Sequence, residues 1–135
     1  MNAAGFLALA ALALLAAGCE SPQVRKLTDE AQALFQSNRG EPDLNAGIKE
    51  YEEGNYREAQ GRLQAALDAG LKNKADKVKA HKYLAFTYCV TDREAKCRDE
   101  FHKALDIDPA FDLTVAEAGH PTWGPVFRSV KGRKP

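Results

Sequence analysis

The chain has 135 residues, 44% of them hydrophobic, and its 19 Lys and Arg residues balance 19 Asp and Glu residues. This length suits one small domain and excludes a multidomain enzyme. The zero net charge excludes a global electrostatic field that would draw the protein to nucleic acid or to an acidic polymer.

Residues 1–18 have the pattern of a bacterial lipoprotein signal peptide. Their apolar run, residues 6–17, is too short to span a bilayer as a helix of about 20 residues. Residues 14–19 read LLAAGC, which resembles the lipobox, in which small residues precede a cysteine that is diacylated and becomes the mature N-terminus. We therefore expect lipidation of Cys19. The alternative is an ordinary secretory cleavage near Ala17 that leaves Cys19 as a free thiol.

Residues 19–23 are the expected lipidated cysteine and a short tether. Three acyl chains exceed the two signals needed for stable membrane attachment. Glu20 follows the cysteine, and a residue other than Asp at this position usually permits transfer to the outer membrane. We expect a lipid anchor on the periplasmic face of the outer membrane of a Gram-negative bacterium, with a domain of residues 24–131 close to the bilayer.

Apolar spacing and breakers predict five helices in the mature chain, and no period-2 strand pattern of useful length occurs. The expected helices are residues 24–36, 45–53, 56–69, 77–89 and 93–106. Turns at Gly54-Asn55 and Thr91-Asp92 join the last four into two hairpins. The sequence therefore predicts an all-α architecture.

The two hairpins repeat with one offset of 38 residues. The matching pairs are Gly47/Ala85, Gly54/Asp92, Ala59/Cys97, Leu63/Phe101, Ala66/Ala104 and Leu67/Leu105. The unit resembles the tetratricopeptide repeat of about 34 residues, and the extra residues fall in the charged connection 72–77, where they add about one helical turn. Small residues at Gly47/Ala85 and Ala59/Cys97 let the two helices of a hairpin approach closely. Two repeats need caps, for which helix 24–36 and the C-terminal segment are the candidates.

The C-terminal segment contains Pro121 and Pro125, each suited to the first turn of a short helix. The apolar residues that then share one face are Val126, Phe127 and Val130. Trp123 is the only tryptophan. Its alternatives are an anchor packed on the last hairpin and an exposed contact for a partner. Residues 132–135 form a basic tail, which we expect to be a solvated end.

The lipobox, the repeat pair and two further segments together resemble the TssQ family of lipoproteins associated with type VI secretion systems. The segments read YCVTDREAKCRDEFHKALDIDPAFDL and AEAGHPTWGPVFRSVK, and the most specific stretch is residues 88–127. The resemblance implies an accessory, outer-membrane-tethered scaffold whose partners are membrane-complex or baseplate components. The alternatives are a pilotin-like or outer-membrane protein assembly factor and a cell-wall-binding protein that acts through the basic tail.

Cys89 and Cys97 remain once Cys19 is lipidated, an even number in an oxidising compartment. They stand at the end of one helix and the start of the next, so the turn can bring them to the Cα spacing of about 5.5–6 Å that a disulfide requires. We expect a disulfide, and the alternative is two buried thiols.

No residue pattern indicates catalysis. His81, His102 and His120 lack metal-ligand spacing, and the chain has no Gly-rich phosphate loop and no G-x-S-x-G motif. We therefore expect a non-enzyme with no metal, no cofactor and no small-molecule substrate.

Repeat hairpins bind a partner helix or an extended peptide in a groove lined by the first helix of each hairpin. The candidate residues for this surface are Lys49, Tyr51, Lys82, Phe86 and Trp123. Packing between repeats is the alternative role for Tyr51 and Phe86. The sequence thus predicts a protein-binding scaffold.

Overall fold

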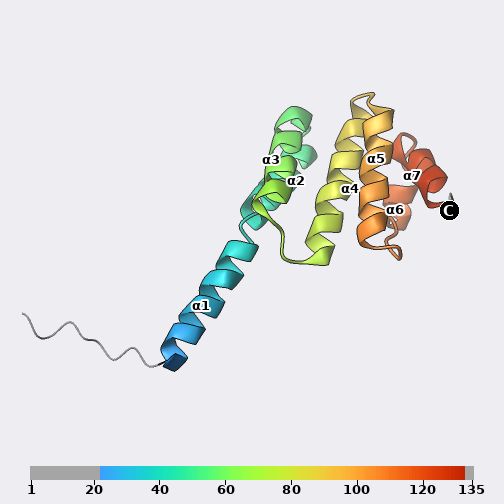
Figure 1. The fold of residues 1–135 in the computed structure, drawn as a ribbon. Helices are drawn as coiled ribbons and strands as arrows, with labels where there is room; N and C mark the ends of the chain where they lie inside the picture. The colour runs from blue at the N-terminus through green and yellow to red at the C-terminus, as the bar shows by residue number, and fades with distance from the viewer. Residues whose placement is uncertain (1–21, 133–135) are drawn as a thin grey trace, which may run out of the picture. The chain divides into compact units, whose positions relative to one another are not determined.

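The computed structural model describes residues 22–132, apart from the side chains of residues 33–37. The described residues form helices and no strand, which confirms the all-α prediction (Figure 1). The helices are α1 (Pro22–Ser37), α2 (Glu41–Glu52), α3 (Tyr56–Ala69), α4 (Lys74–Val90), α5 (Glu94–Ile107), α6 (Val115–Ala118) and α7 (Trp123–Lys131). Within this part of the chain, no helix has the length and apolar character needed to cross a membrane. The expected signal peptide and Cys19 lie outside the described residues.

The chain divides into two units, residues 1–33 and residues 34–135, and each is described by itself. The described part of the first unit is the beginning of α1, which agrees with the helix expected at residues 24–36. Val24 and Leu27 expose 46% and 67% of their surface. A capping role for this helix stays a prediction.

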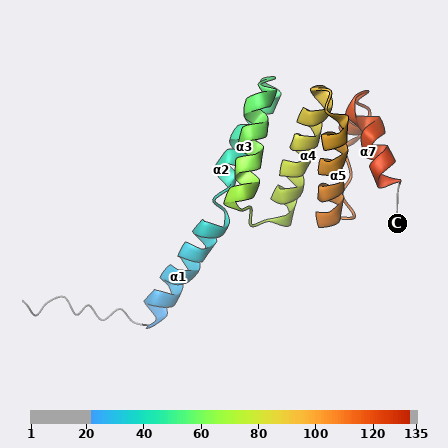
Figure 2. The ribbon, with the colours of Figure 1, turned by 45° about the horizontal axis from the view of Figure 1, so that its top comes forward.

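The second unit consists of two stacked hairpins and a closing helix. Hairpin α2–α3 packs against α4, and hairpin α4–α5 packs against α7 (Figures 1 and 2). Helix α4 contacts both α2 and α3, and α7 in the same way contacts both α4 and α5. Helix α7 therefore packs against the second hairpin in the same way as α4 packs against the first.

The backbone hydrogen bonds of the two turns confirm the 38-residue repeat. In the first hairpin, Gly54 N donates to Tyr51 O at 3.0 Å; in the second, Asp92 N donates to Cys89 O at 3.4 Å. Both Gly54 and Asp92 have positive φ, 81° and 59°. Asp92 is the one described non-Gly residue in this left-handed region. An aspartate therefore forms the turn of the second hairpin, at the position where a glycine forms the turn of the first.

Small residues allow the close approach of paired helices, as the sequence predicts. A Cβ atom added to Gly47 would lie 2.7 Å from Cγ of Leu63, which is too close for two carbon atoms. Ala59, Ala85 and Cys97, at the other predicted close contacts, are fully buried. A larger side chain at Gly47 would push α2 and α3 apart.

Two helix starts differ from the sequence prediction by three residues or more. Helix α2 begins at Glu41 instead of residue 45, because Pro42 lies in its first turn, where the missing N–H of proline costs no hydrogen bond. Helix α4 begins at Lys74 instead of residue 77 and has 17 residues against 12 in α2. The residues inserted between the repeats therefore lengthen α4, as expected for about one added helical turn.

The C-terminal segment caps the second hairpin, as predicted. Val126, Phe127 and Val130 are buried in one cluster with Phe101. Pro125 lies in the first turn of α7, but Pro121 precedes that helix, in a turn where Gly124 N donates to His120 O at 3.0 Å. The prediction that Pro121 lies in the first turn of a helix is therefore wrong.

Helix α6 is absent from the sequence prediction. It has four residues and starts with a capping box, in which the Thr114 side chain accepts a hydrogen bond from Glu117 N and the Glu117 side chain accepts one from Thr114 N. The pattern Thr-x-x-Glu at residues 114–117 is the sequence signal for such a start.

Candidate functional site

Aromatic side chains from the two hairpins and the C-terminal segment form one continuous series, which we call the aromatic row. Its members, in spatial order, are Tyr56, Tyr51, Tyr83, Phe86, Trp123 and His120. Neighbouring ring centroids lie between 3.3 and 5.8 Å apart. The row crosses the first helices α2 and α4 and reaches α7, because α4 contacts both α2 and α7.

Phe86 and Trp123, toward the His120 end of the row, have a structural role. Their rings stack with centroids 4.4 Å apart, and only 2% and 7% of their surfaces are exposed. Trp123 Nε1 donates a hydrogen bond to Glu117 O at 2.9 Å, so the indole has the buried partner it needs. These contacts agree with the anchoring role for Trp123 and with the packing role for Phe86.

The other end of the row consists of three half-buried tyrosines, Tyr51, Tyr56 and Tyr83. Within the described residues, none of their hydroxyl groups takes part in a hydrogen bond. Burial, followed by the negative charges of neighbouring groups, raises the pKa of Tyr51 to about 12 and also raises the pKa of Tyr83. Their rings are thus fixed by packing, while their hydroxyls have no partner among the described residues.

Lys82 and Glu117 border these tyrosines. Lys82 Nζ lies 2.6 Å from Glu117 Oε1, and both side chains are less than a quarter exposed. The same Nζ lies 5.0 Å from the ring centroid of Tyr83 and 5.7 Å from that of Phe86. Burial alone would raise the pKa of Glu117, but hydrogen bonds from Lys82 and from Thr114 N lower it below its ordinary value.

Of the candidate binding residues, the structure brings Tyr51, Lys82, Phe86 and Trp123 together and leaves Lys49 apart. Lys49 Nζ lies 3.7 Å from Glu53 Oε1, one turn along the chain, and its side chain is 73% exposed. No cation–π contact to Lys49 occurs among the described residues. An exposed pair of this kind contributes little to stability or recognition.

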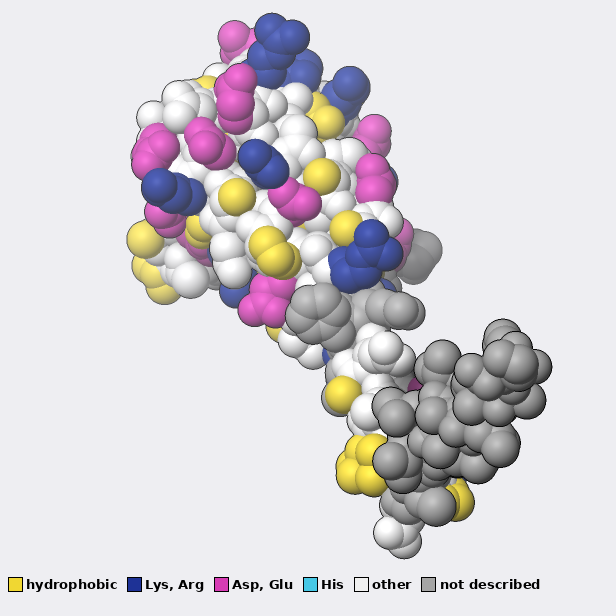
Figure 3. Space-filling model, turned by 90° about the vertical axis from the view of Figure 1, so that its left-hand side faces the viewer, with side chains coloured by type: hydrophobic (Ala, Val, Ile, Leu, Met, Phe, Trp, Pro, Cys, Tyr) yellow, Lys and Arg dark blue, Asp and Glu magenta, His cyan; other side chains and the backbone are white. Residues whose placement is uncertain are grey.

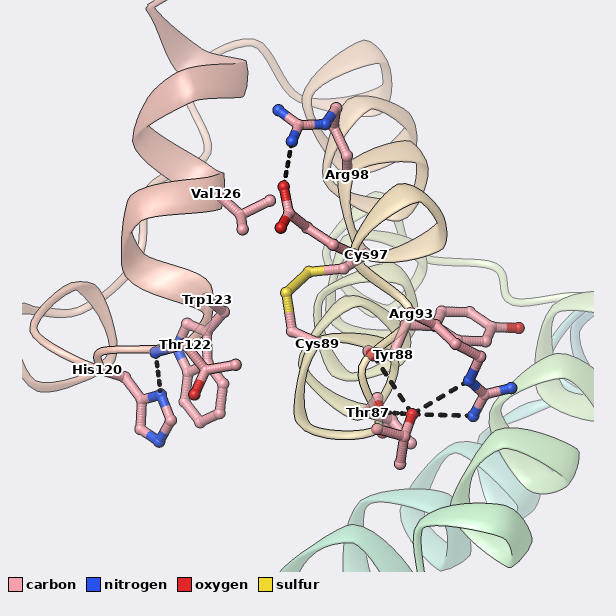
Figure 4. Close-up of a disulfide and its surroundings, with 12 residues drawn as sticks. Thr87, Tyr88, Cys89, Arg93, Cys97, Arg98, His120, Thr122, Trp123 and Val126 are labelled. Atoms are coloured by element: carbon pink, nitrogen blue, oxygen red, sulfur yellow. Dashed lines mark hydrogen bonds and ion pairs between the residues drawn. A yellow bond between two sulfur atoms is a disulfide. The ribbon is translucent and has the colours of Figure 1, made fainter.

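Cys89 and Cys97 form a disulfide beside the row, with Cα atoms 5.2 Å apart (Figure 4). It joins the end of α4 to the start of α5, and Trp123 and Val126 lie on its α7 side. Both cysteines are buried in the same cluster as Phe86. The disulfide therefore links the two helices of the hairpin that supports the aromatic row.

A second polar cluster lies between α4 and α5. Glu100 accepts hydrogen bonds from His81 Nδ1 and Lys103 Nζ, each at 2.6 Å. Burial would raise the pKa of Glu100, but these two partners lower it below its ordinary value. A cavity of about 280 Å³ lies beside this carboxylate. The contact between His81 and Glu100 joins α4 to α5. No group of three side chains that could hold a metal ion occurs among residues 22–132.

Sequence reasoning missed Tyr56, Tyr83 and Glu117 as members of this site. For Glu117 the capping-box pattern was the available signal. For the tyrosines, no local pattern distinguishes a half-buried ring between two helices from a ring in the core. Comparison of the chain with protein-family models, curated proteins and solved structures gave no match.

Proposed function

We propose that this protein is a lipid-anchored periplasmic scaffold that binds protein partners through Tyr51, Tyr56 and Tyr83. The observation that carries the proposal is their common state: rings held by packing, and hydroxyls without a partner among the described residues. Tyrosine in this state offers a large contact area at little cost in conformational entropy, which is why it is enriched at binding hot spots.

The place of the tyrosines in the fold supports the proposal. Tyr51 and Tyr83 lie on the first helices of the two hairpins, α2 and α4, which are the helices that repeat proteins use to bind a helix or peptide. Figure 3 shows a face of the second unit on which charges of both signs alternate with small hydrophobic spots. A mixed surface of this kind favours local side-chain recognition over long-range electrostatic attraction.

The resemblance to the TssQ family supplies the proposed setting. It makes the protein an accessory of a type VI secretion system, with membrane-complex or baseplate components as partners. The lipobox at residues 14–19 supplies the proposed anchor at Cys19 on the outer membrane. The cysteine stands three residues before α1, so the tether is short and keeps the protein at the bilayer.

The proposal is tested by crosslinking a C-terminally tagged protein in cells, purifying it and identifying its partners by mass spectrometry. We expect components of a type VI system to be recovered with the wild type and to be depleted with the double variant Tyr51→Leu/Tyr83→Leu. The matched control is Asp106→Asn, which changes an exposed residue of α5. Recovery of secretin, pilus or β-barrel assembly proteins would instead favour an escort function.

The anchor is tested separately by the variant Cys19→Ser. We expect this variant in the soluble periplasmic fraction and the wild type in the outer-membrane fraction. Membrane retention of the variant would contradict the lipoprotein assignment.

A further inference from the structure

We infer that helix α1 lies along the membrane surface, with its apolar face at the boundary between the lipid headgroups and the acyl chains. The inference rests on the proposed function, because it takes Cys19 as the lipidated residue. It names the bilayer as the occupant of this face, so that α1 is part of the anchor instead of a cap on the repeats.

Exposed apolar side chains gather on α1. Of the three large hydrophobic side chains that are exposed in the described part of the chain, two belong to this helix, Val24 at 46% and Leu27 at 67%. Ala31 is exposed as well. Positions 24, 27 and 31 are spaced by three and four residues, so they share one face of the helix.

Thr28 borders this face, and its hydroxyl is already satisfied within the helix. Its Oγ1 donates a hydrogen bond to Arg25 O at 2.8 Å, and Val24 O is a second acceptor at 3.1 Å. A hydroxyl bonded to backbone carbonyls loses no hydrogen bond when it leaves water. Thr28 can therefore enter the boundary region together with the apolar residues.

The charged side chains of α1 occupy the rest of its circumference. On a helix with 3.6 residues per turn, Arg25, Lys26, Asp29 and Glu30 all fall outside the arc that contains Leu27 and its apolar neighbours. Their two positive and two negative charges balance, so these residues give the helix no net attraction to anionic headgroups and no net repulsion from them. The apolar face therefore decides which side of α1 turns to the bilayer.

The proposed lipid anchor brings this face to the membrane. Cys19 stands three residues before Pro22, the first residue of α1. Three residues reach at most about 11 Å, so the first turn of the helix stays near the headgroups. A chain that is already attached meets the bilayer at a high effective concentration, and a small apolar face is then enough to hold the helix on the surface.

The exposed surface of the second unit offers a helix little apolar area in comparison. Its one exposed large hydrophobic side chain among the described residues is Val115, on the four-residue helix α6. A cap on a repeat array buries an apolar face against the neighbouring repeat. The exposure pattern therefore favours the bilayer as the occupant of the α1 face.

The test uses the lipidated mature protein, reconstituted in vesicles of phosphatidylethanolamine and phosphatidylglycerol. Cys89 and Cys97 are joined, and acylation blocks the thiol of Cys19, so an introduced cysteine is the one thiol open to labelling. A nitroxide is attached in turn to the variants Leu27→Cys, Glu30→Cys and Ala31→Cys. EPR then measures how often each label collides with oxygen, which concentrates in membranes, and with a nickel chelate, which stays in water.

We expect the labels at positions 27 and 31 to collide mainly with oxygen and the label at position 30 to collide mainly with the chelate. Adding Leu27→Glu should shift the label at position 31 toward the chelate. The matched control is Gln32→Glu, which adds the same charge at an exposed position outside the apolar face and should leave that label unchanged. Chelate-dominated collisions at all three positions would overturn the inference. So would labels at 27 and 31 that are shielded from both reagents, which is the result expected for a cap or for contact with a second copy.

These outcomes are separate from those of the proposed function. A wild type found in the soluble fraction together with Cys19→Ser would overturn both the lipid anchor and the inference. A membrane-attached wild type whose position 27 lies in water would overturn the inference alone. Urea unfolding followed by Trp123 fluorescence should be the same for every labelled variant, because the substituted side chains are exposed.

Discussion

Glu117 ties the C-terminal segment to the first helix of the second hairpin, since its Oε1 lies 2.6 Å from Lys82 Nζ although the two residues are 35 positions apart. Its other oxygen accepts a hydrogen bond from Thr114 N at 3.0 Å, and its backbone oxygen accepts one from Trp123 Nε1. One residue thus caps α6, holds the indole and pairs with α4.

Glu117→Gln should therefore lower the free energy of unfolding by about 1 kcal/mol, because it removes a charged partner from a largely buried ion pair. The matched control is Glu53→Gln, which breaks the exposed pair with Lys49 and should cost less than about 0.5 kcal/mol. Urea unfolding followed by Trp123 fluorescence measures both. Equal effects of the two substitutions would contradict the role given to Glu117.

Stability should fall in acid because the pKa values of Glu100 and Glu117 are lower in the folded protein than their ordinary value of 4.5. A carboxyl with a depressed folded-state pKa stabilises the fold fully above its unfolded pKa, and this stabilisation is lost as the pH falls through the folded pKa. We expect a constant unfolding midpoint in urea from neutral pH down to about pH 5 and a decline below it. Glu100→Gln should make that decline shallower, and an unchanged slope would contradict the assignment.

Removing the disulfide should destabilise the protein by about 2.5 kcal/mol, the chain-entropy value for so short a loop. The suitable variant is Cys89→Ala/Cys97→Ala, since Ala59 is the counterpart of Cys97 in the first repeat and alanine fits that close contact. Unfolding of the wild type with and without reductant should reproduce the difference. A wild type whose stability does not respond to reductant would show that the two thiols are not bonded in solution.

Asp92→Gly should stabilise the protein by about 0.5–1 kcal/mol, because glycine adopts the positive φ of this turn without the clash that a Cβ atom causes. The reverse change in the equivalent turn, Gly54→Ala, should destabilise by a similar amount. No atom lies within 4 Å of the position that the new Cβ would take at Gly54, so its effect reports the backbone alone. Thermal unfolding of the two variants checks the opposite signs.

The hairpins were predictable because their signals are local and repeated. The two hairpins share turn residues, Gly54 and Asp92, and small residues, Gly47 and Ala85, at one offset. The turn residues have positive φ, and the small residues are buried where paired helices approach closely. Helix α3 was predicted with its observed bounds, since Gly70 ends it and the Gly54-Asn55 turn precedes it.

The candidate site was only partly predictable, because it depends on how α2, α4 and the C-terminal segment rotate against one another. Tyr51 and Lys82 were identified from their helices, but the meeting of Tyr51 with Tyr83 and of Lys82 with Glu117 is a tertiary contact without a local pattern. Helix α6 was missed because four residues are too few to show helical periodicity.

The most direct test of the binding surface is photo-crosslinking in cells from single positions. A photoreactive phenylalanine analogue replaces Tyr51 in one strain and Asp106, on α5, in another. The account predicts a discrete crosslinked protein from position 51, reduced when Tyr83→Leu is added, and none from position 106. Equal crosslinking from both positions, or none from position 51 in a folded and membrane-attached protein, would contradict the claim that the tyrosine end of the aromatic row binds a partner.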